Sequence, residues 1–134
     1  MYRLSIVAAA ILSTITFAHA DQSTPSGAVE EYNSVLADAT SWAEIASVMS
    51  SQSIAEIESM DQESRDGHLG FISSIAANKQ AFDILDSTVS GDTAEVLAKS
   101  CLEQIVTDET YSMVNEGGVW KVEYVNLSQE NDPC

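Results

Sequence analysis

The chain has 134 residues, of which 21 are acidic and five are basic, so its formal net charge is −16 at pH 7. This length suits one domain of ordinary size that can bury a hydrophobic core. A chain with this negative charge repels the phosphates of nucleic acids and the headgroups of anionic lipids, so we expect neither as a partner. Cationic ligands and basic protein surfaces remain possible partners.

Residues 1–20 have the pattern of a secretory signal peptide. A basic residue precedes the apolar run 4–17, and Ala18-His19-Ala20 supplies the small residues that signal peptidase recognises. The run is too short to span a membrane, and Asp21 follows in place of a lipid-attachment cysteine. We therefore expect one exported domain, residues 21–134, that is periplasmic or secreted and has no membrane span.

Periodicity predicts helices in the first half of the exported part. Apolar residues recur at helical spacing over residues 25–39, behind Pro25 in the first turn. A second helical stretch begins after Ser41 and contains Trp42. Asp61 is placed to cap a third long helix over residues 62–78.

From Gln80 onward the apolar period changes from 3.6 to 2, which is typical of strands. The last strand is expected over 119–127, followed by a polar tail at 128–134. Turns are expected at Ser90-Gly91-Asp92, around Asp108-Glu109, and at Glu116-Gly117-Gly118. The side chains expected on the inner face of the sheet include Ala94, Val96, Ala98, Tyr111, Met113, Trp120, Val122 and Tyr124. On the first strand, Asp86 is expected to share a face with Phe82 and Ile84.

This order predicts the α+β class, in which N-terminal helices pack on an antiparallel sheet of about four strands. Two segments, Gly91-Asp92-Thr93-Ala94-Glu95-Val96 and Gly117-Gly118-Val119-Trp120-Lys121-Val122, make residues 25–127 resemble the nuclear transport factor 2-like superfamily. The resemblance implies a cone-shaped, cystatin-like α+β domain with a curved antiparallel sheet, of the kind found in small exported bacterial proteins of unknown function.

The second of these segments has a packing role. Gly117 and Gly118 permit the positive φ angles of a tight hairpin. Trp120 and Val122 are two residues apart, so they lie on one face of the strand and bury apolar area against the helices.

Cys101 and Cys134 are the two cysteines of the chain, which suggests one internal disulfide in an exported protein. Two free thiols, or a disulfide to another chain, are the alternatives. Neither cysteine lies in a C-x-x-C pair or at metal-ligand spacing, so no metal or cofactor is expected.

No catalytic motif is present, and the candidates for chemistry are single polar residues. Asp86 is a possible base if its strand face lines a pocket, although a solvated carboxylate is the simpler interpretation. His68 is a possible base on the third helix, although a solvated helix face explains it as well. The remaining candidates are the predicted inward tyrosines Tyr32, Tyr111 and Tyr124, which are more often core aromatics.

We therefore expect a non-catalytic exported domain that binds a small ligand or a protein partner. An isomerase- or dehydratase-type enzyme with a polar residue in the cone pocket is the alternative. A third hypothesis is a homodimer through the outer sheet face, where the expected apolar residues are Leu97, Val114, Val125 and Leu127.

Overall fold

The computed structural model describes residues 21–134, so the predicted signal peptide lies outside the described residues. Helices come first and strands follow, which confirms the α+β class. The elements are α1 (Pro25–Asp38), α2 (Trp42–Ala46), α3 (Ser51–Glu58), α4 (Gln62–Asn78), β1 (Gln80–Ser90), β2 (Thr93–Leu102), β3 (Ile105–Glu116) and β4 (Val119–Pro133).

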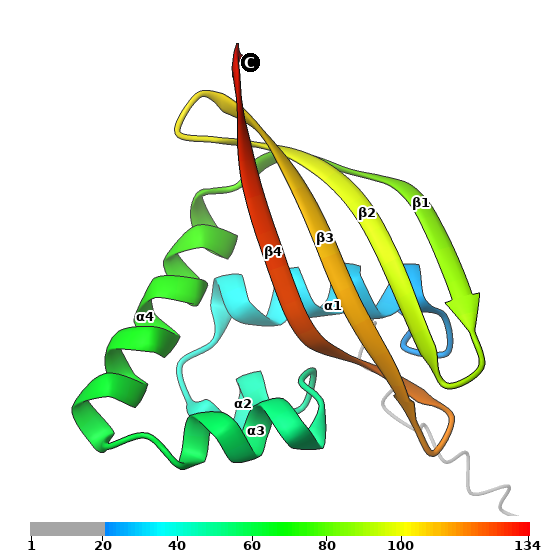
Figure 1. Cartoon of the computed structure of the whole chain (residues 1–134). Helices are drawn as coiled ribbons and strands as arrows, with labels where there is room; N and C mark the ends of the chain where they lie inside the picture. Colours follow the sequence, from blue (N-terminus) through cyan, green and yellow to red (C-terminus); the bar gives the residue numbers. More distant parts are fainter. Residues whose placement is uncertain (1–20) are drawn as a thin grey trace, which may run out of the picture.

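The strands form one antiparallel sheet in the order β1-β2-β3-β4. The sheet curves over α1, which crosses its concave face, while α4 stands beside α1 (Figure 1). The hydrogen bonds from Ser50 N to Val122 O, 2.9 Å, and from Val122 N to Val48 O, 3.1 Å, attach the α2–α3 connection to β4. Two layers therefore enclose the core.

The core lies between α1, the α2–α3 connection and the concave face of the sheet. Its fully buried side chains include Val29 and Leu36 of α1, Val96 of β2, and Tyr111 of β3. Trp120 is 6% exposed and Trp42 is half-buried, as predicted. Burial of this apolar area is the main source of stability.

The long helices begin and end close to their predicted bounds because their capping residues are readable in the sequence. The Thr24 hydroxyl accepts the Gly27 N–H at 3.1 Å, and an Asp61 carboxylate oxygen accepts the Ser64 N–H at 2.8 Å. The helix predicted over residues 62–78 has these bounds in the structure.

The second predicted turn is wrong. Asp108 and Glu109 lie within β3, and the turn is formed by Glu103 and Gln104, whose φ angles are 53° and 66°. Two positive φ angles in a two-residue hairpin loop normally call for Asn or Gly. Because neither residue type is present here, the sequence gives no turn signal at this point.

The predicted facing of β4 is also wrong beyond Val122. Val122 pairs with Met113 and Tyr124 pairs with Ser112, so Glu123 is an extra residue in the ladder. Such a bulge reverses the alternation of side chains. Tyr124 is therefore 63% exposed, while Val125 and Leu127 line the concave side rather than the outer face.

A bulge in β1 has the same effect on Asp86. Ile84 pairs with Ala98 but Asp86 pairs with Leu97, which leaves Leu85 as the extra residue. Asp86 therefore shares the outer face with Leu97 and is exposed. The prediction that it shares a face with Phe82 and Ile84 is wrong, although its carboxylate is solvated as the simpler interpretation holds.

The predicted polar tail is instead the end of β4, which pairs with β3 as far as Pro133. Cys101 and Cys134 form an internal disulfide, with Cα atoms 6.0 Å apart. The Cys134 N–H also donates to the Gln104 carbonyl at 2.9 Å. The disulfide therefore fastens the last strand to the β2–β3 turn. Within residues 21–134, no helix has the length and apolar character needed to cross a membrane.

Candidate functional site

Helix α4 carries apolar side chains but has no fully buried residue. Its residues Leu69, Ile72 and Ala76 pack against the core but are only partly buried. Three hollows lie along α4 as a result, and we call them together the α4 trough. Neighbouring hollows share lining residues, so the trough follows the helix as one connected surface.

The middle hollow has a volume of about 230 Å³ and is mainly apolar. Its walls include Ile72 and Ala76 of α4, Leu36 of α1 and Val125 of β4. The hollow on the α3 side has a volume of about 260 Å³ and shares Ile72 and Val125 with it. An apolar cavity with few polar groups is the usual form of a small-molecule site.

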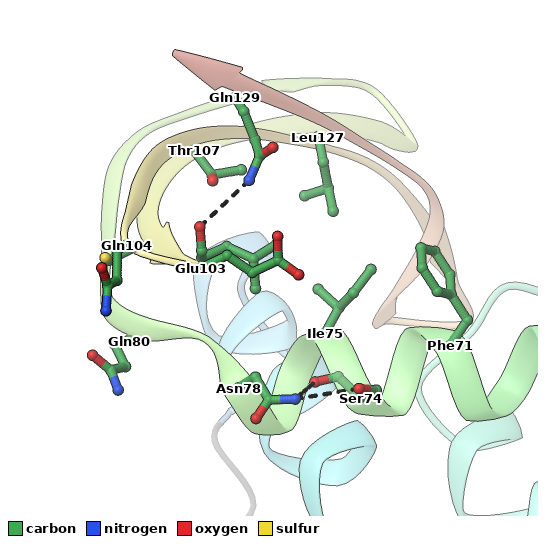
Figure 2. A pocket seen from close by; sticks show the side chains of 12 residues that line it. Phe71, Ser74, Ile75, Asn78, Gln80, Glu103, Gln104, Thr107, Leu127 and Gln129 are labelled. Carbon is green, nitrogen blue, oxygen red and sulfur yellow. Dashed lines mark hydrogen bonds between the residues drawn. The ribbon is translucent and has the colours of Figure 1, made fainter. Parts of the chain in front are cut away.

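The third hollow, on the side of the β2–β3 turn, is larger and more polar, with a volume of about 640 Å³. Figure 2 shows Phe71 and Ile75 of α4 facing Leu127 of β4 across it, with Glu103 of the turn at one side. Phe71 is 65% exposed, although it is a large aromatic residue. The trough therefore opens to solvent at this end.

A buried polar cluster forms part of the floor of the middle hollow. Lys79, at the end of α4, places its Nζ atom 2.6 Å from Glu109 Oε1. The same Nζ lies 2.7 Å from Asn33 Oδ1 and 3.1 Å from the Tyr111 hydroxyl. The Tyr111 hydroxyl also donates to Glu109. Three acceptors therefore use the three N–H groups of Lys79.

Burial shapes the electrostatics of this floor. Desolvation lowers the pKa of Lys79, and its hydrogen bond and charge attraction to Glu109 oppose that shift. Desolvation and then the nearby Glu109 charge raise the pKa of both Tyr32 and Tyr111. Both phenols therefore stay neutral at physiological pH. Within the described chain, Glu109 Oε2 is buried and has no hydrogen-bond partner.

Tyr32 and His68 lie where the middle and α3-side hollows meet, because both residues line both hollows. Tyr32 is 7% exposed and packs edge-on against Tyr111, with ring centroids 6.0 Å apart. His68 is half-buried rather than fully solvated. The structure thus brings Tyr32, His68 and Tyr111 to one trough.

The other two sequence candidates are exposed, each because of a bulge. Asp86 lies outside the trough, whereas Tyr124 is 63% exposed and lines the α3-side hollow. Among residues 21–134, no group of three or more His, Cys, Asp or Glu side chains is placed to hold a metal ion.

Lys79, Glu109 and Asn33 belong to the site but were not predicted from the sequence. Glu109 lies two residues after Thr107 and two before Tyr111, so all three share the inner face of β3. This period of 2 was the available signal for an inward carboxylate. It was obscured by the acidic pair Asp108-Glu109, which reads as a turn. Nothing in the sequence pairs Lys79 with a residue 30 positions away.

Comparisons with known proteins give few matches to this chain. No family model matches the sequence, and no curated protein matches it. Among solved structures, the chain is similar to the solution structure of a SEC-C motif containing protein from Rhodopseudomonas palustris. The identity is 13%, the TM-score is 0.48, and the match covers 79% of this chain and 80% of that chain.

Proposed function

We propose that this protein is an exported binding domain that holds a small, largely apolar molecule in the α4 trough and performs no chemical step on it. The observation that carries the proposal is the apolar face of α4, which is not fully buried against the sheet and instead lines three connected hollows. The hollow at the β2–β3 turn, with about 640 Å³, lies by itself in the range of ~300–1,000 Å³ typical of ligand sites.

The polar floor supports binding rather than catalysis. Lys79 is held by three protein acceptors, so it has no N–H group left for a substrate. Asn33 donates to the Val29 carbonyl at 2.9 Å and to the Tyr111 hydroxyl at 3.0 Å. The N–H groups of Lys79 and of the Asn33 amide are therefore taken up by acceptors of the protein itself.

We infer export from the signal-peptide pattern of residues 1–20, and the internal disulfide supports an oxidising compartment. We also propose a distant relationship to the nuclear transport factor 2-like superfamily. The support for it is the order of elements, with helices first and then a curved antiparallel sheet that bends around α1.

The outer sheet face is a weaker candidate for a homodimer interface than the sequence suggested. Of the four apolar residues expected there, Val125 and Leu127 line the trough instead. We therefore base the proposed function on the trough.

A neutral apolar fluorophore, N-phenylnaphthylamine, tests the proposal. Ala76 lines the middle hollow, whereas the next residue, Ala77, is exposed. Ala76→Trp should fill the hollow and abolish saturable binding of the fluorophore to residues 21–134. Ala77→Trp adds the same side chain to solvent and should leave binding as in the unmodified protein.

Thermal unfolding of both variants checks that each is folded at the temperature of the titration. The proposal would be contradicted if the unmodified protein showed no saturable binding, or if folded Ala76→Trp bound the fluorophore as tightly as Ala77→Trp.

A further inference from the structure

Tyr32 occupies a special place in the α4 trough. It projects from α1, is 7% exposed, and lines both the middle and the α3-side hollows. A buried tyrosine usually gives its hydroxyl a hydrogen-bond partner, since an unpaired polar group in an apolar site is costly. The Tyr32 hydroxyl makes no hydrogen bond to any residue that the structure describes.

Its neighbour Tyr111 shows the contrast. The two rings meet edge-on at 6.0 Å, but the Tyr111 hydroxyl is bonded to Glu109, Asn33 and Lys79. The hydrogen bonds of Tyr111, Asn33 and Lys79 therefore stay within their own cluster, while Tyr32 keeps a free donor at the trough. That donor is neutral, because burial holds its pKa above the ordinary value.

The charges around the trough limit which ligand fits. Glu56 and Glu123 line the α3-side hollow, and Glu103 lines the hollow at the β2–β3 turn. Lys79 is the one Lys or Arg among the lining residues, and it is paired with Glu109. Residues 21–134 carry four bases against all 21 acids, because Arg3 lies before them. An anionic ligand would meet repulsion with no free cation to balance it.

We propose that the trough takes a neutral, largely apolar molecule with a carbonyl-type acceptor at its middle, and that the Tyr32 hydroxyl donates to this acceptor. The apolar arms of the molecule would extend along Ile72 and Val125 into the two adjoining hollows. This inference rests on the proposed function and adds the class of ligand and the residue that selects it.

Two matched probes test the inference. Propionyl-dimethylaminonaphthalene carries a ketone, and dimethylaminonaphthalene has the same rings without it. Tyr32→Phe removes one hydroxyl and keeps the ring. We expect it to weaken binding of the ketone probe by about 3- to 10-fold, the value of one neutral hydrogen bond, and to leave the ketone-free probe unchanged. The emission of the ketone probe should shift to the blue, because its carbonyl loses a donor.

Thr88→Val is the control, since it removes one hydroxyl from an exposed position of β1 that lines none of the three hollows. It should change neither probe. The inference would be overturned if Tyr32→Phe weakened both probes equally, which indicates a packing role, or weakened neither. Tighter binding of an anionic naphthalenesulfonate than of the ketone probe would also overturn it.

The same probes distinguish a failure of this inference from a failure of the proposed function. If Ala76→Trp blocks the ketone-free probe while Tyr32→Phe affects neither probe, ligand binding in the trough stands and the role of Tyr32 falls. If Ala76→Trp leaves both probes bound, the trough itself is not the site.

Discussion

Lys79 and Glu109 form an ion pair with a 2.6 Å Nζ–Oε1 distance, and their side chains are only 6% and 0% exposed. The pair joins the end of α4 to the middle of β3, elements that are otherwise separated by the α4 trough. Lys79 also lies over the Phe82 ring, 5.2 Å from its centroid. This contact therefore sets where α4 ends relative to the sheet.

Breaking the pair should be strongly destabilising. Lys79→Met or Glu109→Gln should each lower the free energy of unfolding by about 3–5 kcal/mol, because each disrupts a buried pair whose groups have no other ion-pair partner among residues 21–134. The double variant should lose less than the sum of the two single losses. Denaturant unfolding of the four proteins measures this coupling.

Lys99→Met is the control for these variants. Lys99 pairs with Glu130 at 2.8 Å and with Asp108 at 3.3 Å, but its side chain is 44% exposed. Its removal should change stability little. Additive losses for Lys79 and Glu109, or an effect of Lys99→Met as large as theirs, would contradict this account.

Alkaline pH should destabilise the fold through Tyr32 and Tyr111. Their raised pKa values mean that the folded protein keeps these protons where the unfolded chain loses them, near pH 10.0. Stability therefore falls as pH rises above that value. Lys79 acts in the opposite direction as pH approaches 10.5, because its folded pKa is lowered.

Above about pH 10.5 the unfolded chain has also lost the Lys79 proton, so the two tyrosines act alone and stability should fall by up to about 2.7 kcal/mol per pH unit. Tyrosinate absorption and circular dichroism check the prediction together. A late step in tyrosinate absorption should coincide with loss of structure. Complete ionisation of all tyrosines while the fold persists would contradict it.

The disulfide should stabilise the far end of β4. Its cysteines are 33 residues apart, and in the chain-entropy model a loop of this length is worth about 3–4 kcal/mol. The Cys101→Ser, Cys134→Ser double variant should lose about this amount. Amide exchange should rise first at residues 129–133. Unchanged exchange there would show that strand pairing alone holds this segment.

Trp120 and Tyr124 test the bulge at Glu123. Trp120 is 6% exposed, so Trp120→Ala should cost about 3–5 kcal/mol of stability. Tyr124 is 63% exposed and Tyr124→Ala should cost little. Comparable losses from the two substitutions, measured by thermal and denaturant unfolding, would mean that the alternation continues through Glu123 without a bulge.

These residues also show how far the sequence predicts the structure. The helix bounds are predictable because Thr24 and Asp61 are capping residues that act locally. The inner faces of β2 and β3 follow from simple alternation, and Trp120 and Val122 lie on the inner face as predicted. Local signals were enough for the α+β class.

The face of the sheet on which a side chain lies cannot be predicted in the same way after a bulge. One extra residue at Leu85 or Glu123 reverses the side chains that follow it, and no residue type marks either position. The prediction of the candidate site was affected most by these reversals. Val125 and Leu127 were placed on the outer face, and Glu109 was placed in a turn, although all three contribute to the trough or to the polar cluster beside it.

The most direct test of ligand binding in the trough is where a bound molecule lies. Residues 21–134 with labelled Ile, Leu and Val methyl groups, mixed with N-phenylnaphthylamine, should show nuclear Overhauser effects between the fluorophore and Ile72, Val125 and Leu127, which line the trough. Effects confined to Leu85, Val89 and Leu97, which are exposed outside it, would contradict the account.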